Sequence, residues 1–304
     1  MVAEVTQQLK DRFQLSEVGK LHYLLGIQVS QQQEGVITLS QGSYIDKILR
    51  RFGMEDCNPQ QLPISPQHGL RKWKEGGRDK PADQLLYQQI IGCLIYLVTG
   101  TRPDLAFVTM LLSQYASKPN TKHMGAAKRV LRYLKGTRDI TLKYHRNGTP
   151  VDTGNGDTGN QLIGFADSDL VNDKDDGKSI SGYIYQLNRN TISWRSKKRS
   201  RKVPTSTTEA ELFAMAYAVK HMLWLQEALR ELQPNQQVDS TLYRDNQGTL
   251  NLLQNYKGGD LTKHVVINYH FLRNVVQERG CFHLQHVPST ENLVDICTKG
   301  LAKP

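Results

Sequence analysis

The segment LIGFADSD (residues 162–169) joins a short apolar run to two acids. An apolar run of this length, bounded by polar residues, predicts a strand over residues 162–167 with Asp167 at its end. Two further runs, residues 181–187 and 191–194, flank the sequence Asn188-Arg189-Asn190, and this pattern is typical of a β-hairpin. Residues 162–194 are therefore predicted to form the first strands of a sheet.

Helical and strand-like segments alternate through the rest of this region. Apolar periodicity predicts helices over residues 209–232, 247–254, 264–280 and 290–301, and strands over residues 240–243 and 281–287. Several strands, followed by strands that alternate with helices, indicate an α/β fold with a mixed sheet flanked by helices.

A second unit precedes this one. Residues 147–160 (NGTPVDTGNGDTGN) contain almost nothing that a core could bury, so they predict a linker. Upstream, we expect a helix over residues 5–13, strands over 21–29 and 36–39, and a helix over 44–52. After a proline-containing loop over residues 58–83, helices are expected over 84–99, 104–116 and 122–135. A length of 304 residues agrees with about two domains.

Composition excludes several classes of protein. A hydrophobic content of 38% is enough to build cores, which argues against wholesale disorder. The best apolar run, residues 90–98, is far shorter than the roughly 20 residues that span a bilayer, and residues 1–13 do not resemble a secretory signal. The four cysteines form no CxxC pair, which argues against a zinc knuckle or a disulfide framework. We therefore expect an intracellular protein that does not insert into membranes, without distinguishing cytoplasm from nucleus.

Positive charge is concentrated in the first half of the chain. The chain contains 39 basic and 29 acidic residues. Residues 1–150 hold 21 of the basic and 12 of the acidic residues, whereas residues 151–304 hold 18 basic and 17 acidic residues. Basic residues are densest over 118–146 and again over 189–202, whereas seven Asp lie between Asp152 and Asp176. A polyanionic partner beside an acidic pocket would account for this alternation. An ordinary solvated surface is the alternative.

Four acids stand near the ends of predicted elements. They are Asp167 after the first strand, Glu211 in the first turn of the long helix, Asp245 after the strand at 240–243, and Asp295 within the final helix. Active sites of open α/β sheets form where strands end, and carboxylates gathered there need cations such as Mg²⁺. Two such ions about 3.5–4 Å apart can activate water and stabilise the leaving oxygen of a phosphodiester. The set therefore suggests a two-metal nuclease.

Each acid also has a structural alternative. Asp167 could be a turn residue, and the neighbouring Asp169 could equally face the site. Glu211 and Glu209 each complete a capping-box pattern, so spacing alone does not choose between them. Asp245 could start a helix, and Asp295 alone is typical of a surface acid. Only the set is informative.

The residues of this region carry a family resemblance. The strings GFADSD, KSISGYIYQL, TISWRSKK, STTEAEL, RDNQGTL, TKHVVINYHFLR and HVPSTENLVDICTKGL occur over residues 161–302. Together they resemble the ribonuclease H domain of Ty1/copia-type retrotransposon polyproteins. Upstream, HYLLGIQV, YQQIIGCLIYL, TRPDLAF and AAKRVLRYLKGT resemble the end of the reverse transcriptase and its connection region. The resemblance implies a reverse-transcriptase remnant (1–60), a mostly helical connection region (61–146), a linker (147–160) and a ribonuclease H-like domain (161–304).

The same resemblance implies chemistry and site residues. It implies Mg²⁺-dependent hydrolysis of the RNA strand of RNA–DNA hybrids, with two Mg²⁺ ions, or Mn²⁺ as a substitute, held by Asp167, Glu211, Asp245 and Asp295. It favours Glu211 over Glu209, because Glu211 occupies the position of the family's glutamate. His286 could assist product release or could be a solvent-facing residue at the end of a strand.

Nucleic acid is the expected partner. The helix over residues 122–135 has apolar residues on one side and a cationic stripe on the other, which suits contacts to phosphates. With the second basic block it supplies the candidate contact residues Lys128, Arg132, Lys135, Lys197 and Lys198. The resemblance adds Lys263 and His264, which match the family's TKH motif and could serve either substrate binding or the structure. Trp194 could stack on a nucleotide, although an aromatic residue in a strand more often belongs to a core.

One departure from the family limits the expected activity. No Tyr-x-Asp-Asp sequence occurs, so the two catalytic aspartates of a polymerase are absent from this sequence. We therefore expect no polymerase activity, and we expect a fragment of a longer polyprotein whose polymerase portion is a further candidate partner. Two functions remain open: a ribonuclease H that cleaves hybrids, and a catalytically inactive remnant that binds nucleic acid.

Overall fold

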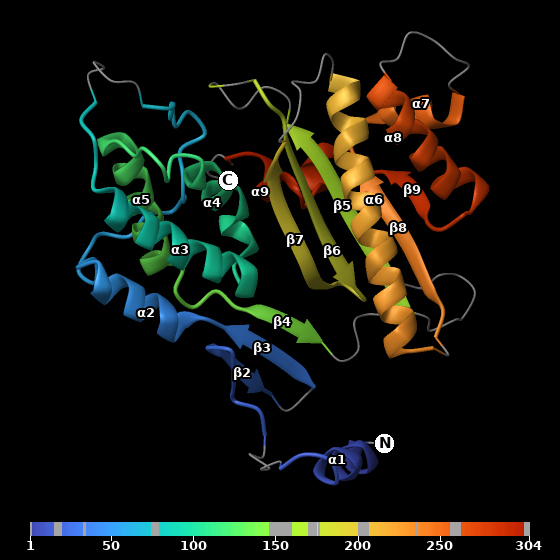
Figure 1. Cartoon of the computed structure of the whole chain (residues 1–304), viewed down its shortest axis with the longest axis horizontal. Helices are drawn as coiled ribbons and strands as arrows, with labels where there is room; N and C mark the ends of the chain where they lie inside the picture. The colour runs from blue at the N-terminus through green and yellow to red at the C-terminus, as the bar shows by residue number, and fades with distance from the viewer. Residues whose placement is uncertain are drawn as a thin grey trace.

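The computed structural model describes residues 2–14, 20–32, 35–73, 79–145, 160–169, 175, 177–199, 207–234, 236–255 and 263–300. Within these ranges the chain forms two packed units, which we call the helical unit (residues 20–145) and the sheet unit (residues 160–300) (Figure 1). Helix α1 (Val2–Lys10) precedes both.

The sheet unit is built on five strands in the order β7-β6-β5-β8-β9. The strands are β5 (Asn160–Asp169), β6 (Ile180–Leu187), β7 (Asn190–Lys198), β8 (Val238–Arg244) and β9 (His283–His286). Strands β5, β6 and β7 pair antiparallel, whereas β8 runs parallel to both β5 and β9. This mixed sheet with its helices confirms the predicted fold class. Asn160, which was predicted to end the linker, is the first residue of β5.

Helix α6 (Thr207–Leu232) packs along one face of this sheet (Figure 1). Its buried residues recur at intervals of three and four, as a helix with one buried face requires: Leu212, Met215, Val219 and Met222. They share a core with residues on the inner face of the strands, among them Leu162, Tyr185 and Leu242. Helices α7 (Gln247–Asn255) and α8 (Lys263–Arg273) complete this side, and α8 continues into a π-helical turn over Asn274–Glu278.

The predicted final helix over residues 290–301 is wrong. The chain instead forms a 3₁₀ turn over Ser289–Glu291 and then the short helix α9 (Asp295–Thr298). Asn292 between them has φ −78° and ψ 98°, which is outside the helical region. The break lets Val294 and Cys297 pack into a buried cluster with Phe165 and Ile184 of the sheet. Asp295 therefore opens a helix instead of lying within one.

The helical unit contains the predicted helices and one strand that the sequence did not indicate. Helices α3 (Gln84–Gly100), α4 (Ala106–Ser113) and α5 (Thr121–Gly136) form its core, with a 3₁₀ turn η1 (Pro103–Leu105) before α4. Strands β1 (Tyr23–Leu24), β2 (Ile27–Gln31) and β3 (Val36–Ser40) are joined by the unpredicted β4 (Leu142–His145) in one antiparallel sheet. Strand β4 is only four residues long and pairs with a strand far from it in the sequence. Its own residues therefore show little of the pattern by which a strand is predicted.

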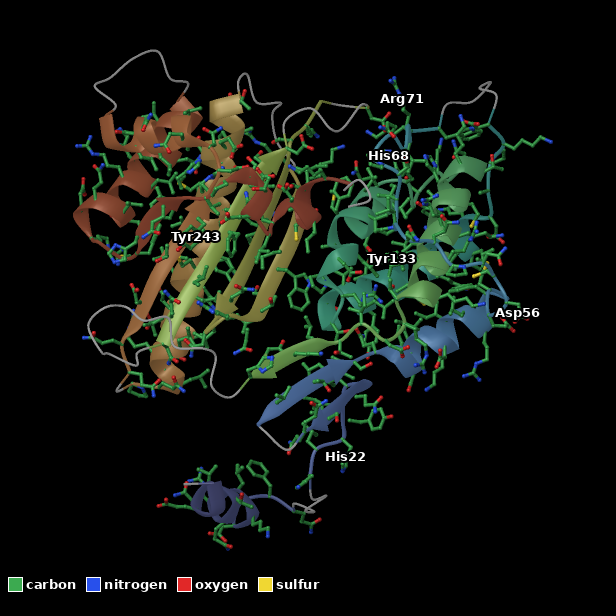
Figure 2. All side chains as sticks on the ribbon, turned by 180° about the vertical axis from the view of Figure 1, so that it is seen from behind. His22, Asp56, His68, Arg71, Tyr133 and Tyr243 are labelled. Carbon is green, nitrogen blue, oxygen red and sulfur yellow. The ribbon has the colours of Figure 1, made fainter. Side chains whose placement is uncertain are left out.

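One core spans the boundary predicted at residue 60. Helix α2 (Gly42–Arg51) contributes Ile45 and Ile48 to the cluster that α3, α4 and α5 form. Just before α2, the buried side chain of Gln41 accepts hydrogen bonds from the backbone N–H (3.0 Å) and the hydroxyl (2.8 Å) of Thr101. Residues on the two sides of this boundary therefore share one core within the helical unit. Figure 2 shows Tyr133 among the helices of this unit and Tyr243 on the sheet of the other.

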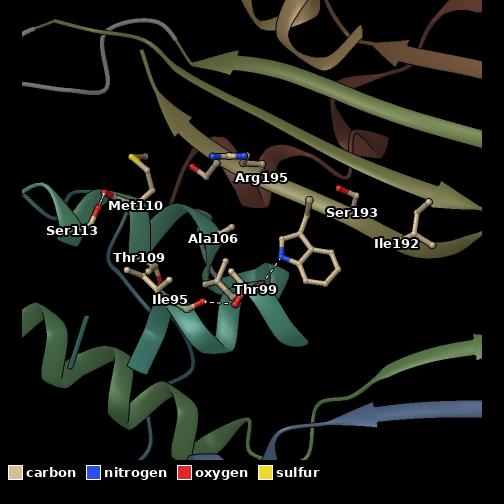
Figure 3. Close-up of a pocket in the computed structure, with 12 residues that line it drawn as sticks. Ile95, Thr99, Ala106, Thr109, Met110, Ser113, Ile192, Ser193 and Arg195 are labelled. Atoms are coloured by element: carbon tan, nitrogen blue, oxygen red, sulfur yellow. Dashed lines mark hydrogen bonds between the residues drawn. The ribbon is translucent and has the colours of Figure 1, made fainter. Parts of the chain in front are cut away.

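The two units meet along the edge strand β7. The indole N–H of Trp194 donates to the carbonyl of Val98 at 2.7 Å, and Lys198 Nζ donates to Gln114 Oε1 at 2.7 Å. Trp194 is thus part of the contact between the units, as the alternative to nucleotide stacking predicts. A cavity of about 560 Å³ remains beside it, with Thr109 and Met110 on the helical wall and Ser193 and Arg195 on the strand wall (Figure 3). None of the helices in the described ranges combines the length and apolar character needed to cross a bilayer.

Candidate active site

Four separate segments bring the candidate acids to one end of the sheet. Asp167 lies near the end of β5 and Asp245 directly follows β8, the parallel neighbour of β5. Glu211 lies in the second turn of α6, and Asp295 is the first residue of α9. Because parallel strands end at the same edge of a sheet, β5 and β8 place their two acids side by side.

Gly182 allows α9 to lie against the sheet beside Asp167. It pairs with Asp167 across β5 and β6. A Cβ atom at this position would stand 2.8 Å from Thr298 Cγ2 and 2.9 Å from Cys297 Cβ, so only glycine leaves room for the helix. The close approach lets the Thr298 hydroxyl donate to Asp167 Oδ2 at 2.7 Å, in a buried setting. Sequence patterns did not single out Gly182 or Thr298.

Arg244 is the residue that connects the acids. Its side chain is fully buried, its guanidinium forms an ion pair with the Glu211 carboxylate, and its Nη1 donates to the Glu211 carbonyl at 2.9 Å. Burial lowers the pKa of Arg244 to about 10, while the charges of Asp167 and Asp245 act in the opposite direction. Sequence reasoning missed this residue, although it directly precedes Asp245 in the RDN string.

Glu209 and Glu211, which spacing could not distinguish, face different partners. Arg199 Nη2 stands 4.0 Å from Glu209 Oε1, and the guanidinium of Arg199 also covers the ring of Phe213 at 3.6 Å. Glu211 instead contacts Arg244, next to Asp245. Both glutamates are buried, and the Glu211 contact with Arg244 links α6 to the strand that precedes Asp245.

Asp245 does not cap the helix that follows it, which was the structural alternative to a role in the site. The following residue takes that role, because Asn246 Oδ1 accepts from the backbone N–H of Thr249 at 3.0 Å. The Asp245 carboxylate instead accepts a hydrogen bond from Ser289 Oγ at 3.0 Å. It therefore points toward the turn that leads to α9.

Asp295 is held by Lys299, one helical turn later. Lys299 Nζ lies 2.8 Å from Asp295 Oδ2. Burial raises the pKa of Asp295, and Asp167 and Asp245 raise it further, whereas Lys299 opposes this shift. Asp295 Oδ1 is buried and has no hydrogen-bond partner among the described residues. The aspartates thus lie within electrostatic reach of one another.

The donor set suits a hard cation, but its arrangement does not form a metal cluster. Carboxylate oxygens are the ligands that Mg²⁺ prefers, and the buried Asp295 Oδ1 would accept a cation. In the parts of the chain that the structure describes, however, no three His, Cys, Asp or Glu side chains are grouped closely enough to hold one ion. Each of the four carboxylates is instead engaged by a donor of the protein itself: Thr298, Arg244, Ser289 or Lys299.

Comparisons with known proteins identify the family. Over 97% of its length the chain is 36% identical to the retrovirus-related Pol polyprotein from transposon RE1 of Arabidopsis thaliana. Over 98% of its length it is 30% identical to the corresponding polyprotein from transposon TNT 1-94 of Nicotiana tabacum. The homologues of this chain are the Pol polyproteins of copia-type transposons.

This Pol chain corresponds to part of its relatives. It spans about a fifth of the curated polyproteins it matches, 19% of the RE1 protein and 22% of the TNT 1-94 protein. Residues 1–66 match the family model described as reverse transcriptase (RNA-dependent DNA polymerase). Among solved structures, LC11-RNase H1 in complex with an RNA/DNA hybrid aligns with 45% of this chain and 93% of its own, at 16% identity and a TM-score of 0.34.

Part of the predicted cationic stripe on α5 of the Pol chain already binds backbone carbonyl groups of the chain itself. On α5, Arg132 Nε donates to the Asn58 carbonyl at 2.6 Å, and the neighbouring Arg129 Nε donates to the Leu62 carbonyl at 3.2 Å. Both arginines thereby hold the segment 58–62 against the helix. Lys128 is exposed and Lys135 is half-buried.

The remaining candidate contacts lie on the sheet unit. Lys197 is exposed on β7 with its ammonium 4.8 Å from the centroid of the Tyr217 ring, whereas Lys198 bridges to the helical unit. Lys263 and His264 open α8, but their side chains lie outside what the structure describes. His286 is exposed at the end of β9.

Proposed function

We propose that the sheet unit is a ribonuclease H that hydrolyses the RNA strand of RNA–DNA hybrids endonucleolytically, with Mg²⁺ as its cofactor and Mn²⁺ as a substitute. The observation that supports this proposal is the meeting of Asp167, Glu211, Asp245 and Asp295, from four segments, at one end of the sheet. Such a cluster is costly unless cations neutralise it, which indicates a function that requires it. The protein would act inside the cell and would not polymerise DNA.

The roles of the four acids differ in this proposal. Asp167, Asp245 and Asp295 are the candidate ligands of two Mg²⁺ ions, and the charges of Asp167 and Asp245 act on Asp295. To share an ion, these carboxylates would have to move closer together than they stand in the structure. Glu211 anchors α6 to the group through Arg244 and is the fourth candidate ligand. Thr298 orients Asp167 through its hydroxyl, and Ser289 orients Asp245 in the same way. These hydrogen bonds would fix the carboxylates before substrate binds.

Replacing Asp245 with asparagine should reduce Mg²⁺-dependent cleavage of a labelled RNA–DNA hybrid by at least about 10²-fold, the size of effect expected when a catalytic charge is lost. The amide keeps the shape of the carboxylate and can still accept from Ser289, so we expect the fold to persist. Asp239→Asn is the matched control, because Asp239 has a half-exposed side chain near the start of β8, whereas Asp245 follows the end of that strand. Equal rates for the two variants, or no acid-dependent cleavage by the unaltered chain, would contradict the proposal.

A catalytically inactive nucleic-acid-binding remnant is the second candidate. It is favoured by the engagement of all four carboxylates with donors of the chain itself, above all Glu211 with the buried Arg244. In this case the chain would bind a hybrid with an affinity that falls as salt rises, because Lys and Arg contacts to phosphates release counterions.

Lys128→Gln should weaken hybrid binding uniformly across sequences and reduce the slope of log affinity against log salt by about 1, since Lys128 is an exposed cation on α5. The measurement is fluorescence anisotropy at several salt concentrations. Lys10→Gln on α1 is the control, because α1 lies apart from both units (Figure 1). An unchanged slope in the Lys128 variant would remove α5 from the binding surface.

A further inference from the structure

Helix α6 carries a row of aromatic residues along one side. Phe213, Tyr217, His221 and Trp224 recur at intervals of three and four residues, so they share one face of the helix. The rings of His221 and Trp224 stack, with their centroids 5.4 Å apart. Trp224 is 61% exposed, whereas the other three are half-buried. The row therefore ends on an indole ring that reaches solvent.

The edge strand β7 carries a row of cations. Arg195, Lys197 and Arg199 occupy alternate positions, so their side chains leave the same face of the strand, about 6.6 Å apart. This is the face opposite to that of Trp194, which contacts the helical unit. Arg199 is near the Glu209 carboxylate, but Arg195 and Lys197 are exposed. Two cations of this row are thus available to a ligand.

The aromatic row and the cationic row contact each other in order along both elements. The contacts are Arg199 over the ring of Phe213 at 3.6 Å, Lys197 over the ring of Tyr217 at 4.8 Å, and Ser193 Oγ beside His221 Nε2 at 2.8 Å. Burial lowers the pKa of His221, and the charge of Arg195 lowers it further, so this ring is neutral at pH 7. We call the surface formed by Arg195, Lys197, Tyr217, His221 and Trp224 the aromatic–cationic strip.

The chemistry of this strip matches an unpaired strand of nucleic acid. Exposed cations neutralise phosphates, and an exposed aromatic ring stacks on a base. Bases within a duplex already stack on one another, so a ring on the protein surface is used best by a strand without a partner. The acid nearest to Trp224 on the same helix is Glu227, which is paired with Arg230. Positive charge therefore dominates beside the exposed indole.

The strip also leads away from the candidate acids. Glu211 lies two residues before Phe213 on α6, and Trp224 lies thirteen residues after Glu211. At 1.5 Å per residue, the strip extends to about 20 Å from the acid along the helix. When the RNA strand of a hybrid is cut into short pieces, the strand that stays continuous is DNA. A freed DNA strand could thus run from the acids along α6 and β7 (Figure 1).

We propose that the aromatic–cationic strip binds single-stranded DNA, the strand that remains when the RNA of a hybrid has been hydrolysed. A base stacks on Trp224, and the backbone phosphates lie against Arg195 and Lys197. The choice of DNA rests on the proposed function. The strip would retain the chain on its product strand after cleavage.

Fluorescence anisotropy with a labelled oligothymidylate of about 15 nucleotides tests this binding on the full chain. EDTA is present, so that no metal-dependent cleavage contributes. Trp224→Leu should weaken binding at least about fivefold, whereas Trp224→Phe, which keeps a ring, should retain most of the affinity. Oligothymidylate should also quench the fluorescence of Trp224, and this quenching should be lost in Trp224→Leu although Trp73 and Trp194 remain. Lys197→Gln should reduce the slope of log affinity against log salt by about 0.7.

Tyr23→Leu and Lys47→Gln are the matched controls. Tyr23 is a 59% exposed aromatic residue on β1 and Lys47 an exposed lysine on α2, and both changes should leave binding and quenching as they are. Absence of binding to oligothymidylate, or equal affinities of Trp224→Leu and Tyr23→Leu, would overturn the inference. Binding through Trp224 that is tighter for oligouridylate RNA would overturn the choice of DNA. Failure of hybrid cleavage with binding intact would contradict the proposed function and leave the strip as a DNA-binding surface.

Discussion

Replacing Arg102 with methionine should lower the free energy of unfolding by about 3–5 kcal/mol, which is the cost of removing one partner from a buried ion pair. Arg102 is fully buried in the helical unit and binds Asp104 with two parallel hydrogen bonds, of 2.9 and 2.7 Å. It also donates to the carbonyl and hydroxyl of Thr137 beyond the end of α5. Tyr133 donates to the same Asp104 carboxylate at 2.9 Å. The substitution would leave this network without its cation.

Arg138→Met is the matched control for that experiment. Arg138 also forms a two-pronged pair, with Asp46, but its side chain is 43% exposed, so its loss should cost only about 0–1 kcal/mol. Urea unfolding followed by circular dichroism measures both variants. A cost for Arg102→Met that does not exceed the control would show that the network does not stabilise the unit.

The Arg102 network also bears on the candidate site. It fixes the 3₁₀ turn η1 and the start of α4, and these elements pack against α9, the helix that carries Asp295. Ala106 of α4 belongs to the same buried cluster as Val294 and Cys297. The helical unit therefore supports the acid-bearing helix directly, and we expect the sheet unit alone to be less stable than it is within the chain.

The sequence predicted best what depends on local pattern. The period of apolar residues in α3, α5 and α6 and the turn residues between β6 and β7 indicate those elements without any partner. Strand β4 escaped prediction because its four residues are a strand only through pairing with β3, far upstream. The final helix was placed wrongly because Val294 and Cys297 pack into the sheet, a tertiary contact that overrides the helical period of residues 290–301.

For the candidate site, chemistry was predictable from residue type and geometry was not. Acids at strand ends pointed to Asp167 and Asp245 through a general property of α/β sheets. The partners of those acids were not predictable, because tertiary packing places them. Arg244 lies on β8, whose neighbours are β5 and β9, and Thr298 lies on α9, which packs against the sheet. A buried arginine looks in sequence like any other basic residue, so the charge balance of the group emerges only from the fold.

Gly182→Ala should distort the candidate site, although Gly182 itself has no side chain that takes part in it. The new Cβ would meet Thr298 Cγ2 at 2.8 Å and Cys297 Cβ at 2.9 Å, distances that real Cβ atoms essentially never show. Since Cys297 is buried, relief must come from movement of α9 away from β6. Overpacking of this kind costs about 1–3 kcal/mol. It would also lengthen the Thr298–Asp167 hydrogen bond and shift Asp295, and a displacement of about 1 Å can reduce a catalysed rate by about 10²-fold.

Gly92→Ala separates this effect from the general consequence of adding a methyl group. A Cβ at Gly92 meets nothing within 4 Å, and because Gly92 lies inside α3 the change should stabilise the chain by about 0.5–1 kcal/mol. Hybrid cleavage and urea unfolding are measured on both variants. If Gly182→Ala loses stability but keeps full cleavage, then α9 does not position the acids. If cleavage falls while most of the stability remains, the contact between Gly182 and α9 sets the geometry of Asp167 and Asp295, through a residue that has no chemistry of its own.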